Sequence, residues 1–140
     1  MHLGLGPATA ISAVCLALAS GSAAQGQTIG FSVQEIALRN GETVEFGDVY
    51  YVGTDCRSLL TDAPEVEILD GPPGVAVTIR RAMVVPRADG CGRSVLGGKM
   101  LISASDIEDY SYTRMVVRFT YRTLSGNVRR SQHINVTLFP

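Results

Sequence analysis

The sequence predicts an all-β protein, an antiparallel β-sandwich of about seven to nine strands with one disulfide. From Phe31 onward, apolar residues recur mainly at every second position, which is the period of a half-buried strand. Clusters of glycine, proline or aspartate separate these stretches, and no window of a dozen residues keeps a helical period. The composition agrees, because 18% charged and 46% hydrophobic residues are typical of a folded domain.

The first 24 residues are predicted to be a secretory signal peptide. They contain no Lys, Arg, Asp or Glu, and residues 8–19 form an apolar stretch. Ser22 and Ala24 then occupy the −3 and −1 positions of a signal peptidase site. A dozen apolar residues are too few to cross a bilayer, which needs about 20. We therefore expect a signal peptide at 1–24, a single domain at 25–140 and no transmembrane anchor in the mature chain.

The mature chain would keep two cysteines, Cys56 and Cys91, in an oxidising compartment. A disulfide between them is the expected outcome. It would close a loop of about 35 residues and contribute about 3 to 4 kcal/mol to stability. A redox pair of the Cys-x-x-Cys type is excluded because the two thiols are far apart in the sequence. Cys15 lies in the signal peptide without a lipobox and is expected to be removed with it.

The strands are predicted by their alternation and by the turn residues between them. In chain order they are residues 31–38, 43–46, 49–52, 65–69, 75–79, 83–85, 99–103, 114–123 and 128–139. The turn signals are Asn40-Gly41 as a hairpin, Gly71-Pro72-Pro73-Gly74 as a tight connection, and Asp89-Gly90 and Gly97-Gly98 as further turns. The sequence contains no internal repeat and no linker, so one domain is expected.

The last two strands allow a prediction of register. A two-residue turn centred on Ser125-Gly126 would pair Met115 with Val136, Val117 with Ile134, and Phe119 with Gln132. Tyr121 falls on the same inward face, beside the stem of Arg130. The outward face then carries Arg114, Arg118 and Arg122 on one strand and Arg129, Ser131, His133 and Asn135 on the other. A slip by one residue would bury the arginines, which favours this assignment of faces.

Ser105 and Glu108 fit a capping box, which predicts a single helical turn before the long strand 114–123. The spacing from Asp106 to Tyr110 resembles the tyrosine corner of immunoglobulin-like sandwiches. This resemblance implies an immunoglobulin-like antiparallel β-sandwich, although the sequence has no tryptophan for its core.

Five segments of the mature chain carry a second resemblance. They are 38–43 (LRNGET), 49–52 (VYYV), 56–58 (CRS), 64–75 (PEVEILDGPPGV) and 135–140 (NVTLFP). In these segments the chain resembles small, uncharacterised exported proteins of alphaproteobacteria. The resemblance implies a periplasmic location and no particular activity.

The sequence offers little for catalysis, metals or nucleic acid. A formal net charge of −1 disfavours a dedicated nucleic-acid binder. His133 is the only histidine after the predicted signal peptide, and no serine lies in a Gly-x-Ser-x-Gly turn. Zinc or copper would need further His or free Cys ligands. The acidic loop with Asp106, Glu108 and Asp109 lacks the spacing of an EF-hand and is expected to be solvated. We predict no catalytic residue, metal or cofactor.

Charge is unevenly distributed along the chain. Residues 25–79 carry two basic and nine acidic side chains, whereas residues 80–140 carry ten basic and four acidic ones. Acidic strand residues such as Glu65 and Glu67, or Glu42 and Glu45, could pair with the arginines inside the sandwich. Alternatively, an open basic face could bind an anionic partner, and the predicted register, which places Arg122 opposite Arg129, would favour that. The residues of this face are Arg114, Arg118, Arg122, Arg129 and His133.

These observations predict a non-catalytic binding or structural module in the periplasm or outside the cell. Its partner would be a protein or an anionic envelope component. The alternative is an adhesive subunit that assembles through an edge strand, because the alternating strand 128–139 and the paired cysteines resemble chaperone-assembled pilins. An enzyme would instead need a pocket that holds His133 beside a nucleophile.

Overall fold

The structure, a computed structural model, describes residues 34–140. The predicted signal peptide 1–24 lies outside the described residues, as do residues 31–33 of the first predicted strand. Within the described range, the chain forms strands and one short 3-10 helix. No helix in that range is long and apolar enough to span a membrane.

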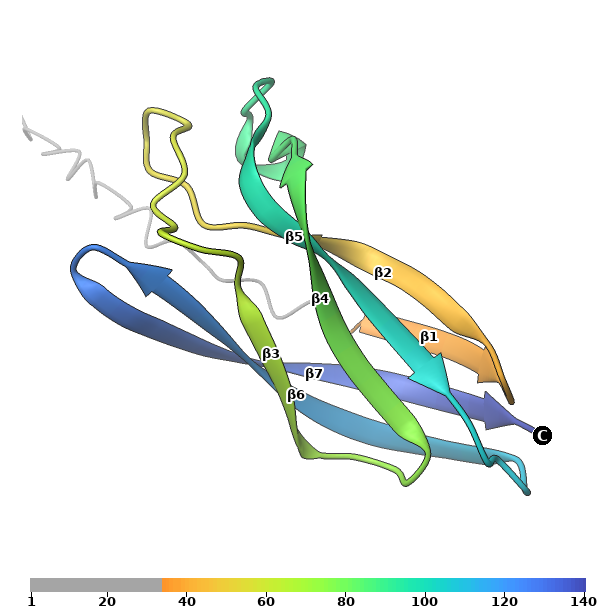
Figure 1. The fold of residues 1–140 in the computed structure, drawn as a ribbon. Coiled ribbons are helices and arrows are strands. Elements are labelled where there is room, and N and C mark those ends of the chain that lie inside the picture. Colours follow the sequence, from red (N-terminus) through yellow and green to blue (C-terminus); the bar gives the residue numbers. More distant parts are fainter. Residues whose placement is uncertain (1–33) are drawn as a thin grey trace, which may run out of the picture.

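Seven strands form two sheets that pack face to face (Figure 1). The elements are β1 (Gln34–Arg39), β2 (Thr43–Val49), β3 (Glu65–Asp70), β4 (Val75–Val84), η1 (Arg87–Asp89), β5 (Val95–Ala104), β6 (Ser111–Thr123) and β7 (Gly126–Phe139). One sheet has the order β1-β7-β6-β3 and the other has the order β2-β5-β4. The predicted all-β sandwich with one disulfide, Cys56–Cys91, is confirmed.

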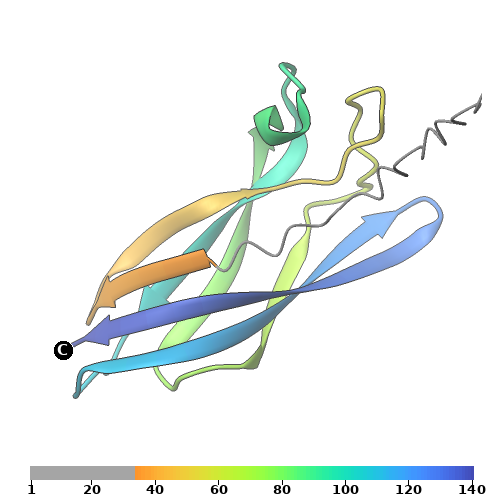
Figure 2. The same cartoon turned by 180° about the vertical axis from the view of Figure 1, so that it is seen from behind.

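One strand pair is parallel, which the prediction of an antiparallel sandwich did not include. β1 lies parallel to β7, with Gln34 beside Ile134 and Arg39 beside Phe139. The last strand therefore lies between β1 and β6 over residues 134–138, so this part of it is not at a sheet edge. Figure 2 shows β1 and β7 side by side, seen from behind. This position does not favour assembly through the end of β7.

The Asn40-Gly41 turn is present, but the predicted hairpin is wrong. The turn carries the chain from β1 in one sheet to β2 in the other. The amide of Asn40 donates to the carbonyl of Phe139 (2.8 Å), and the amide of Gly41 donates to the carbonyl of Ala104 (2.8 Å). The turn residues are thus held by both sheets, which is why the two flanking strands do not pair with each other.

Three predicted boundaries are wrong because neighbouring segments merge. The predicted strands 75–79 and 83–85 merge into one strand, β4, which ends at Val84, and β2 continues to Val49, so no separate strand forms at 49–52. The predicted turn at Gly97-Gly98 lies inside β5. A Cβ on Gly97 would collide with the carbonyl oxygen of Val49, and one on Gly98 would collide with the side chain of Ile79. These glycines allow close approach of neighbouring chain segments and do not mark a turn.

The β6–β7 hairpin keeps the predicted faces but shifts the predicted pairing by two residues. Thr123 is opposite Gly126, so the turn is centred on Leu124-Ser125. The hydroxyl of Thr123 accepts from the amide of Ser125 (3.2 Å) and donates to the carbonyl of Gly126 (2.7 Å), which holds the turn in this place. Met115 therefore pairs with Ile134. Because side chains alternate with period two, an even shift leaves each residue on its predicted face.

The segment between β5 and β6 is neither a helical turn nor a tyrosine corner. Asp106 has a left-handed backbone (φ 56°), and the amide of Ile107 donates to Asn40 Oδ1 (3.2 Å). Tyr110 is 63% exposed and its ring lies against Phe139, with centroids 5.4 Å apart. Both predictions made from this segment are therefore wrong, because the buried Ile107 decides its course.

The core lies between the two sheets and is formed by alternate residues of the long strands. The most deeply buried side chains are Leu38, Ile102, Met115, Val117, Ile134, Val136 and Leu138. β6 and β7 supply five of these seven, since both strands run the length of the sandwich. The outward residues of the same strands form the predicted arginine-rich face.

Candidate functional site

The structure places all five residues of the predicted basic face on the outer side of the β1-β7-β6-β3 sheet. Arg114, Arg118 and Arg122 project from β6, and Arg129 and His133 project from β7. This placement follows from the alternation of β6 and β7, whose inward residues fill the core.

Two of the five are neutralised by β3. The guanidinium of Arg118 donates to Glu67 Oε1 (2.7 Å from Nε), and that of Arg122 donates to Glu65 Oε1 (2.7 Å from Nη2). β3 lies beside β6, so both carboxylates face the arginines across one strand pair. Internal pairing therefore accounts for this part of the face.

The predicted repulsion between Arg122 and Arg129 is absent. The two-residue shift places Arg122 opposite Asn127 and Arg129 opposite Thr120. This argument for an anionic partner is therefore wrong, since it depended on the predicted register.

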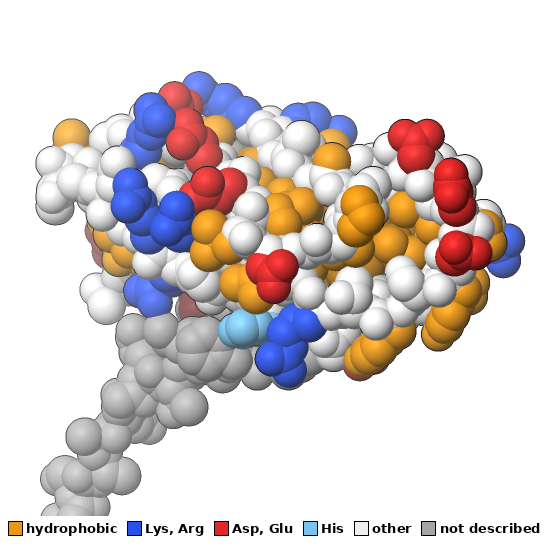
Figure 3. Space-filling view, turned by 90° about the horizontal axis from the view of Figure 1, so that it is seen from below, with side chains coloured by type: hydrophobic (Ala, Val, Ile, Leu, Met, Phe, Trp, Pro, Cys, Tyr) orange, Lys and Arg blue, Asp and Glu red, His pale blue; other side chains and the backbone are white. Residues whose placement is uncertain are grey.

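Arg114 and Arg129 remain without a carboxylate partner. Within residues 34–140, no carboxylate oxygen lies within 4.0 Å of either guanidinium. Residues 1–33 contain no Asp or Glu, so the rest of the chain cannot supply one. Both side chains are exposed, as is His133. Figure 3 shows the histidine beside one basic group, with one acidic group close to both.

The outer face of the β2-β5-β4 sheet is different, because its cations are paired. Lys99 Nζ lies 2.6 Å from Asp48 and 3.4 Å from Glu45, and Arg80 lies 3.3 Å from Glu45. The hydrogen bond to Asp48 is the main reason why the pKa of Lys99 is raised. Lys99 and Arg80 are therefore neutralised within this sheet, unlike Arg114 and Arg129 on the other one.

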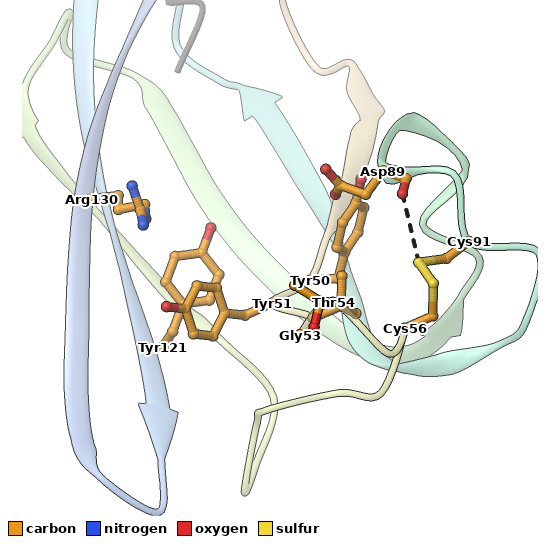
Figure 4. A pocket seen from close by; sticks show the side chains of 10 residues that line it. Tyr50, Tyr51, Gly53, Thr54, Cys56, Asp89, Cys91, Tyr121 and Arg130 are labelled. Atoms are coloured by element: carbon orange, nitrogen blue, oxygen red, sulfur yellow. Dashed lines mark hydrogen bonds between the residues drawn. A yellow bond between two sulfur atoms is a disulfide. The ribbon is translucent and has the colours of Figure 1, made fainter. Parts of the chain in front are cut away.

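A pocket of ≈ 640 Å³ lies between strands β6 and β7 on one side and the segments around Tyr50 and Cys91 on the other (Figure 4). Tyr50 and Tyr51 come from the segment after β2, and Tyr121 and Arg130 come from β6 and β7. The disulfide Cys56–Cys91 forms part of the wall and joins the segment after β2 to the segment after η1. The pocket thus combines four regions of the chain.

The tyrosines form the centre of this pocket. The rings of Tyr51 and Tyr121 lie 5.5 Å apart with an interplanar angle of 31°. Burial, followed by the hydrogen bond and negative charge of Asp89, raises the pKa of Tyr50 to about 12. Burial also raises the pKa of Tyr121, although the positive charge of Arg130 acts in the opposite direction. The hydroxyls of Tyr50 and Tyr121 are therefore neutral at physiological pH.

In Figure 4, Arg130 lies on one side of the Tyr51 and Tyr121 rings, and Tyr50 with Asp89 lies on the other. The contact between Cys91 Sγ and the Asp89 carbonyl oxygen (3.8 Å) is close packing, because a disulfide sulfur carries no hydrogen to donate. The pocket therefore has a positive group and a negative group on opposite sides of an aromatic centre.

The sequence placed Arg130 correctly on the inward face beside Tyr121, but it did not reveal the pocket. The segments with Tyr50 and Asp89 have no strand period that would place them near β7. One signal was present: a charged residue occupies an inward position in an alternating strand. Such a position indicates either a paired charge or an opening to solvent.

The described residues offer no evident metal site. Between Gln34 and Pro140, no three His, Cys, Asp or Glu side chains come together as ligands. His133 faces solvent opposite Val116 and does not line the tyrosine pocket. Comparisons with known proteins add no functional assignment. No protein-family model matches the chain, and no curated protein matches its sequence.

Proposed function

We propose that the chain is an exported, non-catalytic binding module of immunoglobulin-like type. The strand order supports the fold type, because β2-β5-β4 and β3-β6-β7 correspond to the B-E-D and C-F-G strands of immunoglobulin domains. β1 differs from the first strand of a constant domain in pairing with β7. Sandwiches of this type present loops and flat sheet faces for binding, and their architecture alone assigns no chemistry.

Export to the periplasm or outside the cell is supported by two observations. The disulfide Cys56–Cys91 is characteristic of oxidising compartments. The sequence of residues 1–24 has the composition of a signal peptide. A binding role without catalysis is supported by the position of His133, which is exposed on a sheet face opposite Val116. A histidine that acts as a general base must lie within hydrogen-bond reach of a nucleophile, and the residue opposite His133 is the apolar Val116.

The proposed partner is anionic and binds the outer face of the β1-β7-β6-β3 sheet. The observation that carries this proposal is that, among residues 34–140, no carboxylate pairs with Arg114 or Arg129. Guanidinium groups bind carboxylates and phosphates with charge-assisted hydrogen bonds, so exposed and unpaired arginines on a flat face suit such a partner.

The test compares two double variants with the same change in charge. Arg114→Gln/Arg129→Gln removes the unpaired cations, whereas Arg80→Gln/Arg81→Gln removes two cations that pair with Glu45 and Asp62. Each protein is immobilised and exposed to the envelope fraction of its source at low and high salt. We expect salt-sensitive binding that only the first variant loses, since electrostatic contacts weaken with ionic strength. Equal binding by all three proteins would contradict the proposed face.

A further inference from the structure

We propose that the tyrosine pocket binds a small carboxylic acid in which the carboxylate is carried by a hydroxylated six-membered ring. Arg130 would bind the carboxylate, Tyr51 and Tyr121 would contact the ring, and Asp89 would accept from a hydroxyl. This site is separate from the proposed basic face. Arg129 and Arg130 are neighbours in β7, but their side chains point to opposite sides of the sheet.

Arg130 lies where the inward face of β7 changes from buried to exposed. The inward residues Leu138, Val136 and Ile134 of β7 are at most 2% exposed, whereas Arg130, further along the same face, is exposed. The space between the sheets therefore changes from packed core to open pocket along one strand.

The guanidinium of Arg130 has no anionic partner within the protein. From Gln34 to Pro140, no carboxylate oxygen lies within 4.0 Å of it, and residues 1–33 contain no Asp or Glu. The guanidinium is planar and presents paired donors that match the two oxygens of a carboxylate. A ligand carboxylate would thus supply the partner that the chain lacks.

The tyrosine rings of the pocket favour a ligand that contains a ring. Tyr121 is 9% exposed and supports the partly buried Tyr51, whose ring lies 5.5 Å away. Such ring pairs present flat, apolar surface at low conformational cost, and they contact the face of another ring. The pocket volume of ≈ 640 Å³ is within the range of about 300 to 1,000 Å³ that small-molecule sites occupy.

The side of the pocket away from Arg130 contains Asp89, which favours a ligand with a hydrogen-bond donor there. The carboxylate of Asp89 lies with Tyr50 on this side of the pocket, and a carboxylate has several acceptor positions for a ligand hydroxyl. Because Arg130 and Asp89 lie on opposite sides of the rings, the ligand should carry its hydroxyl away from its carboxylate. Hydroxylated aromatic acids and uronic acid sugars share this chemistry.

The experiment uses two probes that separate these sources, 4-hydroxybenzoate and galacturonate. The protein is expressed with its leader, purified in oxidised form from the exported fraction and titrated by NMR. We expect saturable shifts at Tyr51, Tyr121 and Arg130 for at least one probe. The matching neutral compound, 4-hydroxybenzamide or galactose, should bind at least about tenfold more weakly, because it cannot form the charge-assisted hydrogen bonds with Arg130. Which probe binds identifies the source of the ligand.

The variants decide whether the pocket is the site. Arg130→Gln should weaken binding by about tenfold or more, whereas Arg80→Gln, on the outer face of the other sheet, should leave binding unchanged. Tyr51→Leu should also weaken binding, while Tyr112→Leu on the exposed outer face should not. Retained amide spectra show that each variant is folded.

Two results would overturn the proposal: no binding of either probe at about 10 mM, or equal weakening by Arg80→Gln and Arg130→Gln. Neither result bears on the anionic partner of the outer face, which is tested with Arg114 and Arg129 in a different assay. The two proposals can therefore fail independently.

Discussion

The two ends of the sandwich differ in what fills the space between the sheets. At the closed end, which contains the connections 40–42, 71–74 and 105–110, apolar side chains such as Leu138 and Ala104 fill it. At the open end, which contains segments 50–64 and 85–94 and the β6–β7 turn, tyrosines and Arg130 border a pocket. In Figure 1 the sheets lie together near the C-terminus and separate toward the other end.

The difference shows how one alternating strand can serve two purposes. Where the sheets are close, an inward residue must be apolar, because a buried charge without a partner is costly. Where the sheets separate, an inward residue reaches solvent and a charge is tolerated. The open end lacks part of the packing of the closed end, and the disulfide holds its two segments together instead.

The largest expected effect comes from truncation of β7 at the closed half. Ile134→Ala should lower the free energy of unfolding by about 2 to 5 kcal/mol, because it leaves a cavity in a fully buried site. Arg130→Ala, on the same strand and face, should change it by less than about 1 kcal/mol because its side chain is exposed. Urea unfolding measures both. Equal effects would show that the open end is packed as tightly as the closed end.

Removal of the disulfide should have the second largest effect on stability, and this effect should be confined to the open end. The double variant Cys56→Ser/Cys91→Ser releases a constraint across 35 residues, and we expect a loss of about 3 kcal/mol. Hydrogen exchange should increase in segments 50–64 and 85–94, while β1 and the end of β7 keep their protection. Uniform loss of protection across the sandwich would contradict the division into two ends.

Alkaline pH should weaken the open end through Tyr50, with a smaller effect than loss of the disulfide. Its pKa is about 12 in the folded protein and 10.0 for an unperturbed tyrosine, so the unfolded chain loses this proton first. The stability that Tyr50 contributes is therefore complete below pH 10 and is lost as pH rises through 12. Unfolding free energies at rising pH should show a shallower decline for Tyr50→Phe than for the native protein. An unchanged slope would mean that Tyr50 titrates normally.

The sequence predicted the regular part of this molecule well and the irregular part poorly. The faces of β6 and β7 followed from alternation, because successive side chains of a strand point to opposite sides of the sheet. The exact pairing did not, since Thr123 holds the turn through side-chain hydrogen bonds. Gly97 and Gly98 were misread as a turn because their role depends on Val49 and Ile79, which are distant in sequence.

The candidate sites show the same limit. Alternation placed all five residues of the basic face on one side of the sheet, but the pairing of Arg118 with Glu67 depends on β3 lying beside β6. The tyrosine pocket depends on segments without a repeating pattern. Strand period therefore predicts which residues share a face, and tertiary arrangement decides which of them stay free.

The smallest expected effect concerns the exposed ion pairs, and it tests how far the difference between the two ends extends. Arg122–Glu65 lies nearer the open end and Arg118–Glu67 nearer the middle of the sheet, yet in both pairs the side chains are 36% exposed or more. Double-mutant cycles with Gln at each position should give coupling energies of about 0.2 to 1 kcal/mol for both pairs. Solvent screens both pairs in the same way, so their position along the sandwich should not matter. A coupling much larger for one pair would show that the ends differ at their surfaces as well as in the space between the sheets.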